Sequence, residues 1–109
     1  MTKLIEQKMQ DLIRLCRLYK VERLDLFGSA AKGSFLSGSS DLDFVVRFAD
    51  RTPGTYVDRY LDFAEALEDL FDRHVDLLTE AAIRNPYFRR EVEATRQLIY
   101  EQRNEEAAA

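Results

Sequence analysis

The chain has a single cysteine, no long apolar run and no excess of basic residues. Cys16 alone can form neither an internal disulfide nor a cysteine-based zinc site. The N-terminus holds no unbroken apolar stretch, which argues against a signal peptide or a membrane span. Its 16 Lys and Arg residues against 20 Asp and Glu give a net charge of −4, whereas long nucleic acid needs a basic face. We expect a cytoplasmic protein that binds neither membranes nor long nucleic acid.

Length and composition indicate one small globular domain. The 109 residues are 46% hydrophobic and 33% charged, which is ordinary for a globular protein. A chain of this size buries one modest core and has little room for a deep substrate chamber. We therefore expect one domain over residues 1–103, a frayed tail over 104–109, and an active site completed by a second copy or a partner protein.

Apolar periodicity predicts helices and short strands in alternating order, without internal repeats. Helices are expected over residues 2–20 and 55–72 and from Asn85–Pro86 onward, with one helical turn over 29–32. Strands are expected over residues 23–27, 41–48 and 74–78. The last helix is expected to turn a stripe inward that contains Phe88, Val92, Thr95 and Ile99. This order predicts a small α/β (α+β) fold in which helices pack against a sheet.

Three acidic residues are expected on the same face of the sheet. Period-two alternation over residues 41–46 puts Asp41 and Asp43 on one side and the apolar residues on the other. Their Cα atoms lie about 6.6 Å apart on a strand, so both carboxylates can converge on one point. The pattern over residues 74–78 turns Asp76 to the same face. Three such carboxylates repel one another unless a divalent cation joins them, and oxygen ligands suit Mg²⁺ or Mn²⁺.

An isolated Asp-x-Asp pair is most often an exposed part of an ordinary strand. Here Gly28–Ser29 ends the preceding strand and leads into a helical turn, where N–H groups and a hydroxyl can hold phosphate. Lys32 can reach a phosphate or remain solvated. A P-loop is excluded because Ser34 stands where the required lysine would be. A phosphate turn beside three acids predicts a two-metal phosphoryl or nucleotidyl transfer site.

Three segments together resemble the minimal nucleotidyltransferases of the DNA polymerase beta superfamily. They are residues 26–33 (LFGSAAKG), 40–46 (SDLDFVV) and 74–78 (HVDLL). More narrowly, they resemble the MNT antitoxins of HEPN/MNT toxin–antitoxin pairs. The resemblance implies the nucleotidyltransferase fold, with a small mixed sheet of three to four strands flanked by helices. The chain departs from the common pattern because eleven residues, and not ten, separate Ser29 from Asp41.

The resemblance also implies roles for individual residues. Gly28 and Ser29 would hold the β- and γ-phosphates of ATP, with Lys32 close by. Asp41 and Asp43 would bind Mg²⁺, or Mn²⁺, and Asp76 would complete the second metal site and help to deprotonate an acceptor hydroxyl. The expected reaction transfers AMP to a hydroxyl, a tyrosine on a cognate HEPN ribonuclease toxin, which would make the chain its antitoxin. A homo-oligomer, or a hetero-oligomer with the toxin, is expected.

Two other functions stay open. The chain could modify a small-molecule hydroxyl with the help of a separate substrate-binding subunit, or it could neutralise a toxin by binding alone.

Several side chains are expected to have structural roles. His74 should face the same side as Asp76, which leaves a role near the metal site open, but it is interpreted as an ordinary strand-edge residue. Cys16 is interpreted as a buried thiol. The helical spacing of the aromatic residues assigns them to the core: Tyr56, Tyr60, Phe63 and Phe71. The basic residues near the last helix are interpreted as a solvated face balanced by acids, the alternative being a contact surface for a partner, RNA or nucleotide: Arg84, Arg89, Arg90 and Arg96.

Overall fold

The protein is built on a four-stranded mixed sheet. The computed structural model describes residues 3–32, 41–49 and 54–102. The strands are β1 (Val21–Phe27), β2 (Leu42–Phe48), β3 (Val75–Thr79) and β4 (Gln97–Glu101), in the order β3-β2-β1-β4. Strand β1 pairs antiparallel with β2 and β4, whereas β2 and β3 are parallel. The parallel pair needs the long crossover that α4 provides.

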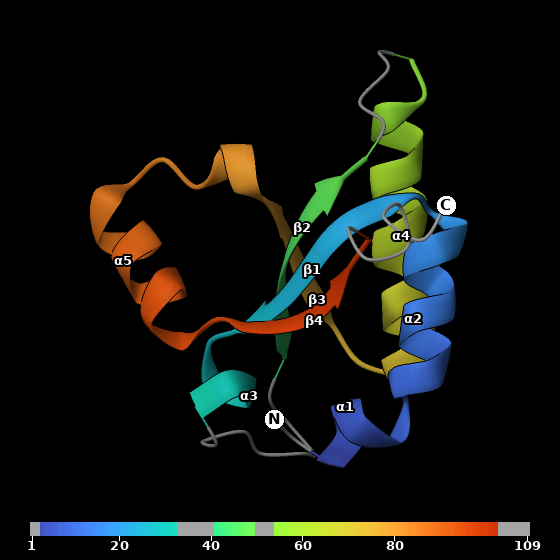
Figure 1. Cartoon of the computed structure of the whole chain (residues 1–109), viewed down its shortest axis with the longest axis horizontal. Coiled ribbons are helices and arrows are strands. Elements are labelled where there is room, and N and C mark those ends of the chain that lie inside the picture. The colour runs from blue at the N-terminus through green and yellow to red at the C-terminus, as the bar shows by residue number, and fades with distance from the viewer. Residues whose placement is uncertain (1–2, 33–40, 50–53, 103–109) are drawn as a thin grey trace.

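Helices cover both faces of this sheet, as Figure 1 shows. They are α1 (Lys3–Gln7), α2 (Met9–Leu18), α3 (Ser29–Lys32), α4 (Tyr56–Phe71) and α5 (Pro86–Thr95), with a 3₁₀ turn, η1, at Glu80–Ala82. Helices α2 and α4 lie side by side on one face, and α5 lies on the other. Asn85 caps α5, because its side chain accepts the N–H groups of Tyr87 and Phe88.

The main core lies between the sheet and helices α1, α2 and α4. Leu42, Phe44 and Val46 of β2 are fully buried in it, as the alternation predicts. Phe63 and Phe71 belong to this core, and Tyr56 and Tyr60 pack against it, which confirms their expected structural role. Cys16 is also fully buried there, as expected.

A second, smaller core lies under α5. It joins Phe27 of β1 and Val45 of β2 to Ile83 and to Val92 of α5. The middle of β2 is therefore buried on both faces, which explains the continuous apolar run over residues 44–46. Within β2 only Asp43 and Arg47 are partly exposed.

Two expected helices differ from the prediction. The first is broken at Lys8, so α1 and α2 replace one continuous helix. The last helix ends at Thr95, because Arg96 takes an extended backbone conformation with ψ 140°. Ile99 therefore does not continue the helical stripe but lies in β4, where Tyr100 is buried and pairs with Leu24 of β1. The expected three to four strands are thus four.

Some expectations fall on residues that the structure does not describe. They are the start of the first expected helix at residue 2 and the tail over 104–109, and the side chain of Lys32 is outside the description too. Among the helices of the described ranges, none is both long enough and apolar enough to cross a membrane.

Candidate active site

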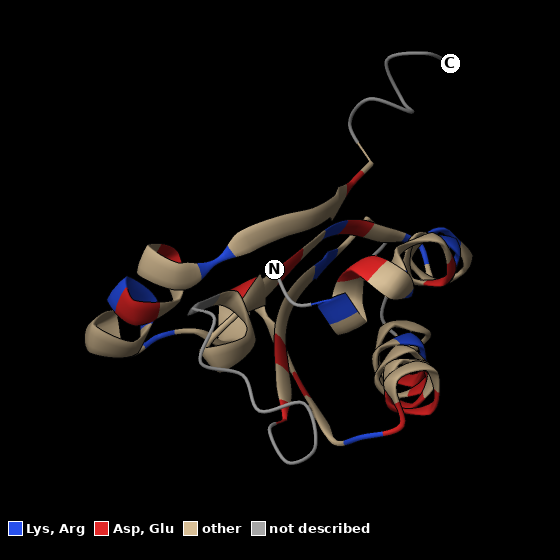
Figure 2. Ribbon diagram, turned by 90° about the horizontal axis from the view of Figure 1, so that it is seen from below, with Lys and Arg blue, Asp and Glu red and all other residues tan. Residues whose placement is uncertain are grey.

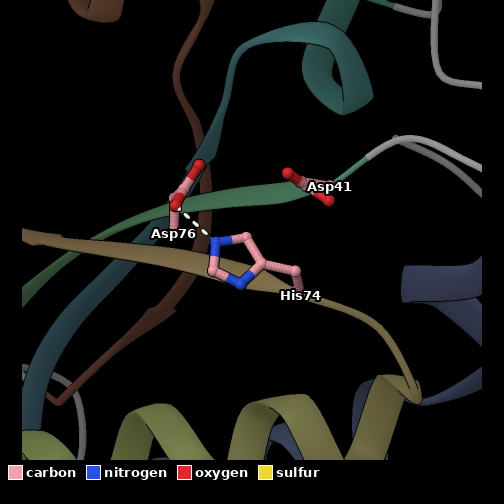
Figure 3. Close-up of side chains that lie close together, drawn as sticks. All are labelled: Asp41, His74 and Asp76. Atoms are coloured by element: carbon pink, nitrogen blue, oxygen red, sulfur yellow. Dashed lines mark hydrogen bonds and ion pairs between the residues drawn. The ribbon is translucent and has the colours of Figure 1, made fainter.

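The three predicted acids meet at one end of β2 and β3. Asp43 and Asp76 are direct Cα partners in the parallel register of the two strands, so their side chains share a face. Asp41 stands just before β2. Ligand atoms of Asp41, Asp76 and His74 all lie within 4.8 Å of one another. Figure 3 shows these three side chains close together. The structure therefore brings together all three carboxylates expected from the sequence.

The carboxyl group of Asp43 is harder to ionise than that of an exposed aspartate. Partial burial, the facing side chain of Asp76 and the charge of Asp41 raise the pKa of Asp43 from 3.8 to about 6, and His74 partly offsets this. The neighbouring charges raise the free energy of the ionised form, and a bound cation would lower it. A raised carboxyl pKa in a cluster of acids is typical of functional sites.

His74 joins the acids, so the structure favours the alternative of a place near the acidic cluster over the strand-edge interpretation. Its Nε2 lies 2.8 Å from Asp76 Oδ1, and its Nδ1 lies 3.1 Å from Glu68 Oε2 on α4. The hydrogen bond to Asp76 is the main reason why the pKa of this exposed histidine is raised. His74 thus links Asp76 to α4 and is more than a simple edge residue. The signal in the sequence was its spacing of two residues from Asp76, which puts both side chains on one face.

Gly28 brings the predicted phosphate turn against the acids. Its φ is +74°, and a Cβ at this position would lie 2.5 Å from Asp43 Oδ2. Only glycine combines this left-handed backbone with so close an approach. Ser29 follows as the first residue of α3. The turn expected to hold phosphate and the carboxylates expected to hold metal are therefore direct neighbours.

A pocket of about 530 Å³ opens next to this cluster. Gly28, Asp43 and Asp76 line it on the polar side, and α5 contributes Phe88 and Thr95. The pocket thus places an aromatic side chain near two carboxylates and the glycine turn. A volume of this size is within the range of small-molecule sites.

The residues fit a hard divalent cation. Asp41 and Asp76 place carboxylate oxygens close to each other and to a ring nitrogen of His74, and Asp43 adds a carboxylate opposite Asp76. Carboxylate oxygen is the ligand type that Mg²⁺ and Mn²⁺ prefer. Burial first, and then the neighbouring carboxylates of Asp76 and Asp41, raise the pKa of Asp43, and a positive charge at this place would counter these effects.

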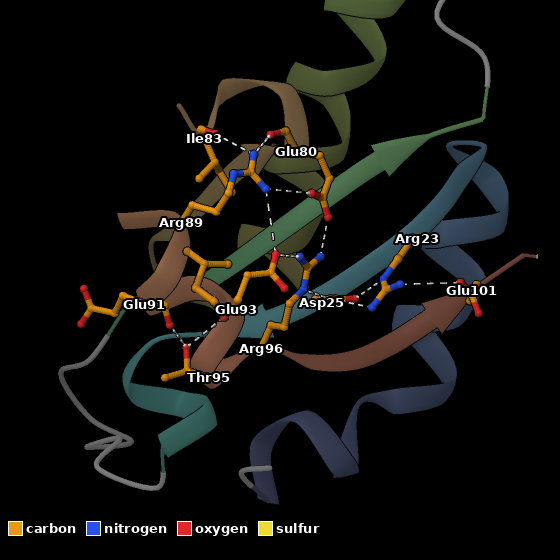
Figure 4. A network of polar contacts seen from close by, with 11 residues as sticks. Arg23, Asp25, Glu80, Ile83, Arg89, Glu91, Glu93, Thr95, Arg96 and Glu101 are labelled. Carbon is orange, nitrogen blue, oxygen red and sulfur yellow. Dashed lines mark hydrogen bonds and ion pairs between the residues drawn. The ribbon is translucent and has the colours of Figure 1, made fainter. Parts of the chain in front are cut away.

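Two of the basic residues in and after α5, Arg89 and Arg96, have structural contacts that the solvated-face interpretation missed. Arg96 is only 12% exposed and forms ion pairs with the fully buried Asp25 and with Glu80 and Glu93, as Figure 4 shows. Arg89 donates hydrogen bonds to the carbonyls of Glu80 and Ile83, and it is half-exposed. These two arginines therefore hold α5 to η1 and to the sheet. Figure 2 shows both charge signs mixed on α5 rather than one basic face.

Comparison with known proteins agrees with this geometry. The family described as "Nucleotidyltransferase domain" matches residues 12–99. The chain belongs to this family. As a nucleotidyltransferase it is an enzyme of the class that moves a nucleotidyl group from a nucleoside triphosphate, with a divalent metal in general use across the family.

Two curated relatives come from Methanocaldococcus jannaschii. Both are named "Putative protein adenylyltransferase", and they are 38% and 37% identical to this nucleotidyltransferase. Each alignment spans 82 residues, which is 75% of this chain and 78% of the relative. The aligned region therefore represents most of both proteins.

Solved structures share the fold of this nucleotidyltransferase. One described as a "putative minimal nucleotidyltransferase" has a TM-score of 0.70 and 26% identity, covering 88% of this chain and 95% of the other. A toxin–antitoxin structure with AMP-PNP has a TM-score of 0.64 and 23% identity, covering 91% and 78%. A chain of a structure described as a tri-AMPylated Shewanella oneidensis HEPN toxin in complex with MNT antitoxin has a TM-score of 0.61 and 19% identity. This match covers 94% of the present chain and 77% of the other.

Proposed function

We propose that this nucleotidyltransferase is a Mg²⁺-dependent protein adenylyltransferase. It transfers AMP from ATP to a tyrosine hydroxyl of a cognate HEPN ribonuclease toxin and acts as the antitoxin. The observation that carries the proposal is the convergence of Asp41, Asp43 and Asp76 beside Gly28. Acids on neighbouring strands next to a glycine turn suit a metal-bound triphosphate better than a structural role.

Each side chain of the site has a distinct task in this reaction. Asp41, Asp43 and Asp76 hold Mg²⁺, or Mn²⁺ in its place. When bound, the cation supplies charge neutralisation at the phosphates and lowers the pKa of the acceptor hydroxyl. Asp76 is kept in place by its hydrogen bond to His74, and it accepts the proton of the hydroxyl.

Gly28 and Ser29 orient the triphosphate for in-line attack. The turn holds the β- and γ-phosphates, and the acidic cluster lies next to it. The acceptor oxygen bonds to the α-phosphorus while the bond from that phosphorus to the bridging oxygen of the β-phosphate breaks. Pyrophosphate leaves with this oxygen and its electron pair, and AMP stays on the acceptor. Holding both reactants in this geometry is itself a large part of the rate enhancement.

The relatives support the choice of nucleotide and acceptor. Proteins at 38% and 37% identity are named for adenylyl transfer to protein. Structures with the same fold include a toxin–antitoxin pair with AMP-PNP and a tri-AMPylated HEPN toxin with its MNT antitoxin.

The test is a mass measurement on the partner. The chain is co-expressed with the product of the neighbouring gene as the candidate HEPN partner, and the intact mass of that protein is determined. We expect one or more adenylyl increments with the wild type and none with the double variant Asp41→Asn, Asp43→Asn. Asp62→Asn, which changes an exposed carboxylate on α4 outside the site, should behave as the wild type.

The same experiment separates the two alternatives. Full protection from the toxin without any mass increment by the wild type would indicate neutralisation by binding alone. Pyrophosphate release from ATP that depends on a small hydroxyl compound, such as an aminoglycoside, and not on the HEPN protein would indicate a small-molecule acceptor. Either result overturns the proposed acceptor, and the second leaves the transfer chemistry intact.

A further inference from the structure

The Gly28 turn is tied to the far end of the chain through one hydroxyl. The backbone N–H of Gly28 donates to Thr95 Oγ1 at 3.3 Å, across 67 positions of sequence. The same hydroxyl donates to the carbonyl of Glu91 at 3.1 Å, one helical turn back in α5. The hydroxyl of Thr95 thus accepts a hydrogen bond from the Gly28 turn and donates one within α5. Figure 4 shows the hydrogen bond within α5.

The residues that follow Thr95 hold the same corner of the molecule. Arg96 is fixed by carboxylates of Asp25, Glu80 and Glu93. The amide of Gln97 donates to the carbonyl of Ala31 in α3 at 3.4 Å. Three consecutive residues therefore contact the turn, the sheet and α3. The contacts of Arg96 and Gln97 therefore hold in place the backbone next to Thr95, whose hydroxyl accepts the N–H of Gly28.

The position of Gly28 is also coupled to the acidic cluster. There is no room for a Cβ between Gly28 and Asp43, since that atom would lie 2.5 Å from the carboxylate oxygen. Gly28, Thr95, Asp43 and Asp76 line one pocket. A shift of the turn would therefore change the distance between the phosphate-holding backbone and the carboxylates.

We infer that Thr95 is a positioning residue for nucleotide binding, which acts by fixing the Gly28–Ser29 turn against the carboxylates through its hydroxyl. This inference rests on the proposed function, in which that turn holds the triphosphate. Thr95 acts through Gly28 and needs no contact with the nucleotide. Its loss should weaken the binding of the triphosphate more than it affects folding, because the backbone of the turn that it fixes holds the β- and γ-phosphates.

The variants Thr95→Val and Thr95→Ser separate hydrogen bonding from shape. Valine keeps the shape of threonine without the hydroxyl, whereas serine keeps the hydroxyl. We expect Thr95→Val to raise KM for Mg·ATP at least tenfold with a smaller change in kcat, and Thr95→Ser to stay within threefold of the wild type. Thr79→Val is the matched control, because Thr79 lies at the end of β3 and does not line the pocket.

A second measurement needs neither metal nor nucleotide. Amide hydrogen exchange of Gly28, followed by NMR on the metal-free protein, should be at least fivefold faster in Thr95→Val than in the wild type. It should be unchanged in Thr95→Ser and Thr79→Val. An unchanged Gly28 exchange rate in Thr95→Val, or faster exchange with an unchanged KM, would overturn the inference.

Failure of the proposed function would be visible in the wild type alone. A wild type that transfers no AMP contradicts the proposed reaction, whatever the variants do. A wild type that is active together with an indistinguishable Thr95→Val contradicts only the role of Thr95.

Discussion

Replacing Asp43 by asparagine should make the metal-free protein more stable at neutral pH. The pKa of Asp43 is raised from 3.8 to about 6 by burial and by the neighbouring acids, so the folded state favours the protonated carboxyl. The favourable contribution is fully present below pH 3.8 and is lost as the pH rises through 6. Asparagine is neutral at every pH and avoids this loss, although it can no longer bind a cation.

The magnitude follows from the shift. About two pKa units correspond to about 3 kcal/mol if the group is fully shielded. Asp43 is partly exposed, and solvent screening reduces this to about 1 kcal/mol. For a domain of this length, 1 kcal/mol changes Tm by about 4 °C. Asp43→Asn should therefore melt about 4 °C above the wild type at pH 7 in EDTA, and the two should be equal near pH 4.

In the presence of Mg²⁺ the wild type should become more stable than Asp43→Asn. At a concentration tenfold above its Kd, a ligand stabilises the folded state by about 1.4 kcal/mol. Thermal unfolding followed by circular dichroism, with EDTA or MgCl₂, measures both effects, and Asp62→Asn is the control. The reasoning is refuted if Asp43→Asn is no more stable than the wild type in EDTA at pH 7. It is also refuted if MgCl₂ stabilises the variant as much as the wild type.

Three further predictions concern the surroundings of the site. Gly28→Ala and Gly54→Ala share the cost of a positive φ, about 1–2 kcal/mol. The added methyl group of Gly28→Ala also clashes with the carboxylate of Asp43, so this variant should lose at least about 1 kcal/mol more free energy of unfolding in urea than Gly54→Ala. Equal losses in the two variants would rule out the clash. Arg96→Ala leaves a buried aspartate short of a partner and should lower the free energy of unfolding by about 3 kcal/mol, while the exposed Arg84→Ala should change it by less than about 0.5 kcal/mol. Burial raises the pKa of the Cys16 thiol to about 12, so a disulfide reagent at pH 8 should modify it only as fast as the protein unfolds; rapid labelling of the folded protein would contradict its burial.

Local patterns were sufficient for most of the elements. Strands β1, β2 and β3, helix α4 and the Asn85 cap agree with the sequence prediction to within a few residues. The prediction failed at the end of α5, where the residues after Thr95 carry apolar side chains that are compatible with either a helix or a strand. These residues form strand β4 because they pair with β1. The sequence periodicity of a segment does not reveal which strand lies next to it.

The candidate site, too, was predicted only in part from the sequence. The sequence by itself put Asp41 and Asp43 on one face, because side chains alternate with a period of two in a strand, and the apolar neighbours of Asp76 predicted the same face for it. Only the tertiary structure decided that Asp43 stands directly opposite Asp76, since this depends on the parallel register of β2 and β3. The bonds from Thr95 to Gly28 and from Arg96 to Asp25 join residues 67 and 71 positions apart. Contacts at such separations arise only when the whole chain has packed, so no local pattern encodes them.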